Sequence, residues 1–127
     1  MHIHSILSLS PDGKTLAKQL WEENMHEPWS DYNGSDMFVV LDGGDIVGGF
    51  AIYQDESDGL KGTFCSGWAG RHRGVPTDRI IKQIASNVGD VYFKTDQRTA
   101  KILLEKIGKK VKTTDRFGYY IVKGIQK

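Results

Sequence analysis

Apolar residues recur at helical spacing in three stretches of the chain, at about 12–24, 76–88 and 97–107. In each stretch the apolar positions lie three and four residues apart, which places them on one face of a helix. The first stretch begins at Ser10-Pro11-Asp12, which favours a helix start, and the third is followed by Gly108, where a helix would stop. The pattern therefore predicts three amphipathic helices.

Runs rich in β-branched and aromatic residues predict the strands. Two such runs flank Asp42-Gly43-Gly44, the residues that a tight hairpin turn requires. Other strands are expected at 2–9, 61–70 and 90–95, and as a closing pair within 109–124, with a polar turn at 55–60. This order predicts an α/β fold in which one mixed, mostly antiparallel sheet is flanked by three to four helices. The early hairpin breaks the strand–helix alternation of a doubly wound dinucleotide-binding fold.

Length and composition narrow the class of protein further. A chain of 127 residues with 39% hydrophobic and 26% charged residues predicts a single globular domain over residues 1–127. A net charge of +1 argues against a surface built as a whole for nucleic acid, so a nucleic-acid partner is not expected and any basic function must be local. The one cysteine, Cys65, favours a reducing compartment. Since neither a signal-peptide pattern nor a membrane-spanning run is present, we expect a soluble cytoplasmic protein without a membrane partner.

The segment GRHRGVP, at 70–76, places basic residues between glycines directly before a predicted helix. A strand that leads through glycines into a helix offers unpaired backbone N–H groups and the positive end of the helix dipole, which suit a pyrophosphate. Arg71 and Arg73 would add charge-assisted contacts, and Gly74 would let the backbone approach closely. The alternative is a solvated, glycine-rich corner.

In three segments the chain resembles the GNAT family of N-acyltransferases, which use acetyl-coenzyme A. The first segment is VVLDGGDIVGGFAIY, which resembles the family's second and third strands. The second is RHRGVP, which resembles its pyrophosphate loop, Arg/Gln-x-x-Gly-x-Gly/Ala. The third is QRTAKILLEKIG, which resembles the helix Asn-x-x-Ala-x-x-x-Tyr-Glu-Lys-Leu-Gly with Gln97 in place of Asn. A fainter similarity, in EKIG and GYYIVKG, is to small GNAT-like proteins of bacteriophages.

The resemblance implies a GNAT-like sheet with a V-shaped splay, and the transfer of an acetyl group from acetyl-coenzyme A to an amine of a small molecule or peptide. It implies that the pyrophosphate is held by Arg71, His72, Arg73, Gly74 and Val75, with help at the helix start from Thr77. It places Gln97 and Lys101 near the adenosine or pantetheine, and the acceptor amine near Trp29 and Tyr32. Packing in the core or in a lid is the alternative for these two aromatic residues and for Trp21.

Three residues depart from the family's pattern. Pro76 stands where the family has Gly or Ala and has no N–H to donate, while Asp78 puts a negative charge in the same first turn. Leu104 stands where the family often has the tyrosine that protonates the leaving thiolate. No catalytic residue is therefore assigned, and an active protein would rely on proximity and on backbone N–H groups. The alternative is a catalytically silent GNAT-like protein with a structural or binding role, as a phage virion component, in a protein assembly or as a homodimer.

Other residues have both a functional and a structural interpretation. His2 and His4 share one face of a predicted strand, but without nearby ligands an ordinary edge strand is favoured over a metal site. The lysine cluster would bind phosphate or nucleic acid, or would complement the end of a helix, which is the favoured interpretation; it consists of Lys106, Lys109, Lys110 and Lys112. Three acidic residues would hold a cationic acceptor or form a solvated face, which is favoured; they are Glu22, Glu23 and Glu27.

Four further side chains would lie near the chemistry if the resemblance holds. Tyr53, Tyr92 and Cys65 would approach the reacting thioester, although a buried structural cysteine is favoured for Cys65. Trp68, next to the basic loop, would cover the pantetheine arm or fill the gap between diverging strands.

Overall fold

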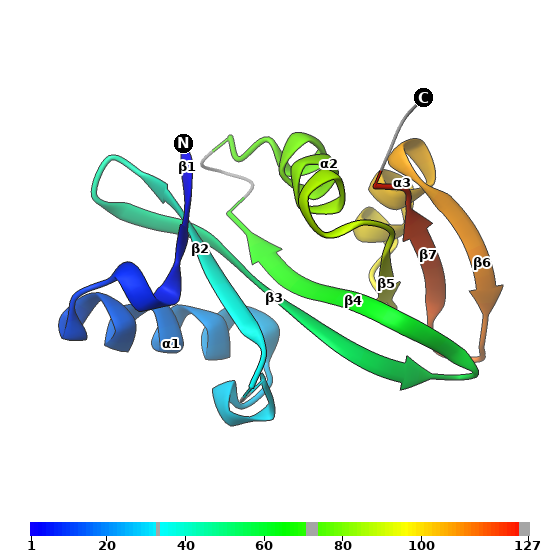
Figure 1. The fold of residues 1–127 in the computed structure, drawn as a ribbon, viewed down its shortest axis with the longest axis horizontal. Coiled ribbons are helices and arrows are strands. Elements are labelled where there is room, and N and C mark those ends of the chain that lie inside the picture. Colours follow the sequence, from blue (N-terminus) through cyan, green and yellow to red (C-terminus); the bar gives the residue numbers. More distant parts are fainter. Residues whose placement is uncertain (33, 71–73, 125–127) are drawn as a thin grey trace. The chain divides into compact units, whose positions relative to one another are not determined.

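The computed structural model describes residues 1–32, 34–70 and 74–124, and Figure 1 shows the arrangement of their helices and strands. The elements of this part of the chain are β1 (His2–Ser5), η1 (Ile6–Ser8), α1 (Pro11–Met25), η2 (Trp29–Tyr32), β2 (Asp36–Asp42), β3 (Asp45–Ser57), β4 (Leu60–Ala69), α2 (Thr77–Val88), β5 (Val91–Thr95), α3 (Arg98–Ile107), β6 (Lys109–Thr113) and β7 (Gly118–Val122). The strands form one mixed sheet in the order β1-β2-β3-β4-β5-β7-β6. The predicted α/β fold class and element order are thus confirmed.

The chain divides into two compact units. Unit 1 comprises Met1–Tyr53 and Ser66–Val75, and unit 2 comprises Gln54–Cys65 and Pro76–Lys127. Strands β3 and β4 each contribute residues to both units. Within the described residues, no helix is both long and apolar enough to cross a bilayer.

Helix α1 covers the β2–β3 hairpin in unit 1. Its start is capped by Ser10, whose Oγ accepts a hydrogen bond of 3.1 Å from the backbone N–H of Gly13. Its apolar side faces inward, and the fully buried Trp21 packs in one cluster with Met37 of β2 and Ala51 of β3. The predicted helix is confirmed, and it ends one residue later than expected.

The hairpin predicted at Asp42-Gly43-Gly44 is also confirmed. Asp42 pairs with Asp45, and Gly43 has the left-handed φ of 63° that the turn needs. The polar turn predicted at 55–60 is wrong in extent, because β3 continues to Ser57 and only Asp58-Gly59 form the turn. Both turn residues have positive φ, 50° and 83°, as in a two-residue hairpin connection. Exposed polar residues can occupy a strand whose end faces solvent, so composition alone misplaced this boundary.

The first strand is shorter than predicted. It ends at Ser5, and residues 6–8 form the short 3-10 helix η1 instead of continuing to residue 9. Ser5 turns the chain, because its Oγ accepts from the N–H of Leu7 and its carbonyl accepts from the hydroxyl of Ser8. Local side-chain hydrogen bonds of this kind compete with strand pairing and left no signal in the apolar pattern.

Helices α2 and α3 pack on unit 2, where they contact each other and both contact β7. Their buried side chains are Ile81, Ile84 and Ala85 of α2 and Leu104 of α3. Strand β5 pairs with β7 over its whole length, whereas its parallel register with β4 is given by the single pair Phe64–Tyr92. Both residues of this parallel pair belong to unit 2.

Candidate functional site

The loop between β4 and α2 is the first candidate site. Of its predicted contacts to a pyrophosphate, Arg71, His72 and Arg73 lie outside the described residues. Gly70, which precedes them in unit 1, donates its N–H to the Val47 carbonyl at 2.8 Å and so fixes the end of β4 against β3. Gly74 has a left-handed φ of 68°, and a Cβ built there would meet nothing within 4 Å. The glycine is thus used for its backbone conformation, in an open position that a ligand can approach.

The start of α2, in unit 2, has the properties of an anion site. The helix begins at Thr77, and its N-cap residue Pro76 makes no side-chain capping hydrogen bond. The first turn lies at the positive end of a 12-residue helix, which attracts anions. Pro76 withholds one donor, and the exposed Asp78 places a carboxylate in the same turn. The residues present fit a phosphate group here, with one N–H fewer and one negative charge more than a bare helix start would have.

Gln97 and Lys101 lie at the start of α3, also in unit 2. Gln97 precedes the first helical residue; its carbonyl accepts from the Lys101 N–H at 3.0 Å, and its own N–H donates to Thr95 Oγ1 at 3.1 Å. The Gln97 side chain is exposed and makes no capping hydrogen bond. It is thus held by its backbone while its amide stays available, as a ligand contact requires.

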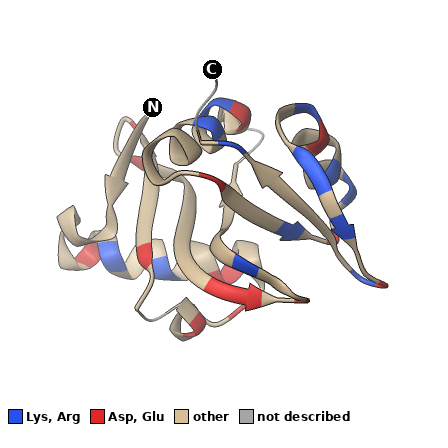
Figure 2. Ribbon diagram, turned by 45° about the vertical axis from the view of Figure 1, so that its right-hand side comes forward, with Lys and Arg blue, Asp and Glu red and all other residues tan. Residues whose placement is uncertain are grey.

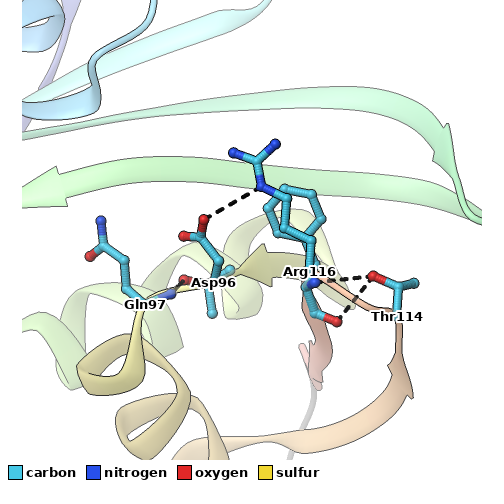
Figure 3. Close-up of polar contacts among 6 residues, drawn as sticks. Asp96, Gln97, Thr114 and Arg116 are labelled. Carbon is cyan, nitrogen blue, oxygen red and sulfur yellow. Dashed lines mark hydrogen bonds and ion pairs between the residues drawn. The ribbon is translucent and has the colours of Figure 1, made fainter.

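The turn between β6 and β7 flanks this start of α3 (Figure 3). Asp96 pairs with Arg116 at 3.6 Å, and the Arg116 guanidinium lies over the Phe117 ring at 4.9 Å. The Phe117 N–H donates to Thr114 Oγ1 at 3.0 Å, which closes the turn. Sequence reasoning missed this cluster, because it joins residues that are about twenty positions apart and share no motif.

The candidate acids differ in what they can do. Leu104 is buried in unit 2 with 3% exposure and carries no proton to donate. Burial raises the pKa of the Cys65 thiol to about 12, so this side chain is neither ionised nor exposed at neutral pH. Tyr92, also in unit 2, is half-buried with its ring 5.3 Å from that of Phe64. Of these three residues, only Tyr92 combines partial exposure with a hydroxyl group.

The predicted acceptor residues Trp29 and Tyr32 meet in unit 1 around a buried indole. Trp21 makes edge-to-face contacts with both, at centroid distances of 5.8 Å to Trp29 and 4.9 Å to Tyr32. Tyr53 extends the group, 5.8 Å from Tyr32, and its hydroxyl lies 2.7 Å from Ser66 Oγ. We call these four aromatic residues the aromatic cluster. Trp29 and Tyr32 thus both contact Trp21, while their role toward an acceptor stays a prediction.

Two carboxylates from the end of α1 and the residues after it hold the aromatic cluster in place. Glu22 accepts the backbone N–H of Trp29 at 2.8 Å, and Glu27 accepts the hydroxyl of Tyr32. Burial, together with the bond to Glu27, raises the pKa of Tyr32 well above its usual value, so the phenol stays protonated at neutral pH. The sequence favoured a solvated face for Glu22 and Glu27, but both carboxylates accept hydrogen bonds from residues of the aromatic cluster. No sequence signal pairs them with these partners.

Trp68 on β4 also belongs to unit 1, where it packs against Gly49 of β3. A Cβ at Gly49 would lie 3.0 Å from Trp68 Nε1, so the indole rests directly on this glycine. Trp68 is half-buried beside the aromatic cluster. Trp68 thus packs within unit 1, while both of its predicted roles stay predictions.

His2 and His4 are both exposed on β1, with ring centroids 6.3 Å apart. Within the described residues, no group of three His, Cys, Asp or Glu side chains is placed to hold a metal ion.

This architecture is that of the N-acetyltransferases, the class of fold that the sequence resemblance implied. The chain is similar to the Campylobacter jejuni N-acetyltransferase PseH, solved in complex with acetyl-coenzyme A, at 12% identity and a TM-score of 0.64 over 96% of this chain and 97% of that one. It is similar to the ribosomal-protein-S18-alanine N-acetyltransferase of Escherichia coli at 14% identity and a TM-score of 0.59, covering 99% and 95%. It is similar to an aminoglycoside N(6')-acetyltransferase of Legionella pneumophila at 11% identity and a TM-score of 0.55, covering 91% and 76%.

At these identities the shared property is the fold. Neither a sequence model of a protein family nor the sequence of a curated protein matches the chain. These three similar structures come from bacterial proteins, so the similarity gives no support to the phage origin or the virion role of the alternative interpretation.

Proposed function

We propose that the protein transfers an acetyl group from acetyl-coenzyme A to an amine, as a single acyltransferase domain over residues 1–127. The observation that carries this proposal is the fold shared, over almost the full length of both chains, with an N-acetyltransferase solved with acetyl-coenzyme A. The start of α2 supports it, because the positive end of a helix dipole favours an anionic pyrophosphate. The acceptor is a small molecule or a peptide, since similar structures are named for an aminoglycoside and for a ribosomal protein.

In this proposal the pyrophosphate is bound by the β4–α2 loop and by Thr77 at the helix start; the loop residues are Arg71, His72, Arg73, Gly74 and Val75. Gln97 and Lys101 contact the adenosine or pantetheine from α3. Trp29 and Tyr32 border the acceptor. When bound, acetyl-coenzyme A would supply an activated thioester: the amine nitrogen would form the new C–N bond as the C–S bond breaks, and the proton that the amine loses would balance the departing thiolate. The protein contributes orientation and exclusion of water, because Leu104 cannot protonate the leaving group.

The aromatic cluster suits an acceptor that presents an apolar or cationic surface. The faces of Trp29 and Tyr32 attract cations, and both side chains are only partly buried. The protonated Tyr32 acts as a hydrogen-bond donor at neutral pH and not as the base that deprotonates the amine. We expect the protein in the cytoplasm, in keeping with its single, buried cysteine. A homodimer or another assembly partner stays a prediction.

Thermal unfolding with acetyl-coenzyme A tests the proposal. Ligand at a hundredfold excess over Kd stabilises the folded state by about 2.7 kcal/mol, which is roughly 10 °C in Tm for a chain of this size. Arg71→Ala should reduce this shift, whereas Lys14→Ala, which removes the same charge from an exposed position of α1, should leave it unchanged. Release of coenzyme A in the presence of primary amines then identifies the acceptor class. The absence of a Tm shift at millimolar acetyl-coenzyme A would refute the enzyme and would leave a catalytically silent protein.

A further inference from the structure

The charges of the chain are divided unequally between the two units. Unit 1 contains eight acidic and four basic residues, whereas unit 2 contains thirteen basic and eight acidic residues. The net charge of +1 for the whole chain hides this separation. In Figure 2, blue lysine and arginine positions gather on α3 and along β6. If the protein has a local basic function, α3 and β6 of unit 2 are therefore its most basic surface elements.

Four lysines form what we call the lysine edge: Lys106, Lys109, Lys110 and Lys112. Lys106 lies in the last turn of α3, and the other three lie on β6, the outermost strand of the sheet. All five residues of β6 are exposed. Lys110 pairs with Tyr120 and Lys112 with Tyr119, two neighbouring residues of β7 whose side chains point to opposite faces. The lysines therefore border both sides of the open strand edge.

Neighbouring carboxylates compensate only part of this charge. Lys110 lies 3.5 Å from Glu105, with both side chains about half exposed, and 5.9 Å from the Tyr120 ring. Lys112 donates to the Asp58 carbonyl, while the Asp58 carboxylate accepts the Tyr119 hydroxyl. The ammonium groups of Lys106 and Lys109 form no hydrogen bond or ion pair with any described residue. One cation in the last turn is enough to complement a helix dipole, so the helix alone does not explain the cluster.

We propose that the lysine edge binds the phosphodiester backbone of duplex nucleic acid. Lysine ammonium groups contact phosphates as point charges, and such binding does not depend on base sequence. A duplex is favoured over a single strand because β6 itself carries no aromatic side chain, and none of the exposed large hydrophobic side chains in the described part of the chain is aromatic. This proposal is independent of acetyl transfer.

An acidic peptide added to the sheet as a further strand fits the edge less well. The register of β6 shifts between Lys110 and Lys112, and an irregularity of this kind interrupts the regular hydrogen-bonding edge that an added strand needs. Lysines along an outer strand also oppose strand addition. The features that block a peptide backbone leave the ammonium groups accessible to phosphates.

Fluorescence anisotropy with a labelled, mixed-sequence DNA duplex of about 20 base pairs tests the proposal. If four lysines neutralise four phosphates, log K should fall with log salt with a slope of about −3.6, so affinity should drop about 100-fold between about 50 and 200 mM salt. Two duplexes of unrelated sequence should bind alike. Absence of binding at about 50 mM salt, or tighter binding of poly-glutamate than of duplex at equal charge concentration, would overturn the proposal.

A pair of triple variants separates the lysine edge from overall charge. The test variant combines Lys106→Gln, Lys109→Gln and Lys110→Gln, and keeps Lys112 because its ammonium holds the β3–β4 turn. The control combines Lys14→Gln, Lys18→Gln and Lys82→Gln, exposed positions of α1 and α2, and has the same net charge. The test variant should lose affinity at least about tenfold and keep a salt slope near −1, while the control binds like the parent. Equal losses in both variants, with unchanged melting temperatures, would show that binding is non-local and would reject the lysine edge.

Discussion

Replacing Gly67 of β4 by alanine should destabilise unit 1, because the neighbouring strand leaves no room for a methyl group. A Cβ at this position would lie 2.6 Å from the carbonyl oxygen of Gly49, 2.8 Å from Cβ of Phe50 and 3.1 Å from its Cα. None of these β3 atoms belongs to the flexible end of a side chain, so no rotamer change can relieve the overlap. The strands would have to separate by roughly 1 Å, at a cost that we place at about 3 kcal/mol, the upper part of the range for overpacking.

Two glycines of the β2–β3 turn provide matched controls in the same unit. A Cβ at Gly43 or at Gly44 would meet nothing within 4 Å, but Gly43 has a φ of 63°. Gly43→Ala should therefore cost about 1 kcal/mol through backbone strain alone, and Gly44→Ala should change stability by less than about 0.5 kcal/mol. Gly67→Ala thus tests the lack of space, Gly43→Ala tests the backbone conformation, and Gly44→Ala is a control in which neither factor operates.

Urea denaturation followed by far-UV circular dichroism measures all three variants on one scale. For Gly67→Ala, a loss of about 3 kcal/mol corresponds to a fall of roughly 10 °C in Tm for a chain of this length. The m-value should stay constant, since the unfolded state is the same. A Gly67→Ala protein as stable as Gly44→Ala would refute the reasoning, because β3 and β4 could not then approach as closely as the distances require.

Two further predictions concern the candidate sites. The free energy of unfolding should fall as pH rises past about 10, because Tyr32 keeps its proton in the folded state while the unfolded phenol ionises. Tyr32→Phe should flatten this loss in denaturation curves recorded between about pH 8 and pH 11. An unchanged loss would contradict the raised pKa of Tyr32. Pro76→Ala should supply one more N–H at the start of α2 and tighten acetyl-coenzyme A binding several-fold in calorimetry, a gain of about 1 kcal/mol. Asp78→Asn should add to this gain, and an unchanged Kd in both variants would place the phosphate elsewhere.

The sequence predicted those elements whose causes are local. The β2–β3 turn follows from Gly43, and α1 follows from the Ser10 cap and an apolar stripe that includes Trp21, so neighbouring residues suffice to specify them. Gly108 shows the limit of such reasoning. It was expected to stop the helix, and α3 does end there, but its φ is −145°, an extended value, and a Cβ there would lie 3.1 Å from Cγ2 of Val122. Its role is spacing between α3 and β7, which no local pattern encodes.

The candidate sites were predictable only in part for the same reason. Trp29 and Tyr32 could be named because the family resemblance places the acceptor beside their segment. The hydrogen bond from the Trp29 backbone N–H to the Glu22 carboxylate could not be predicted from the sequence, since it depends on how the chain folds back after α1. The charge separation was hidden as well, because β3 and β4 each divide between the two units and no contiguous half of the sequence corresponds to either.

Because Cys65 is buried, the rate at which its thiol is labelled reports local opening of the native protein. A thiol reagent can react with this single cysteine only after the chain around β4 opens, because the closed state leaves almost no accessible thiolate at neutral pH. The labelling rate in native buffer therefore measures the opening equilibrium around β4, the strand that leads into the basic loop. A ligand that orders this region should slow labelling in proportion to its occupancy, without any change to the sequence of the protein.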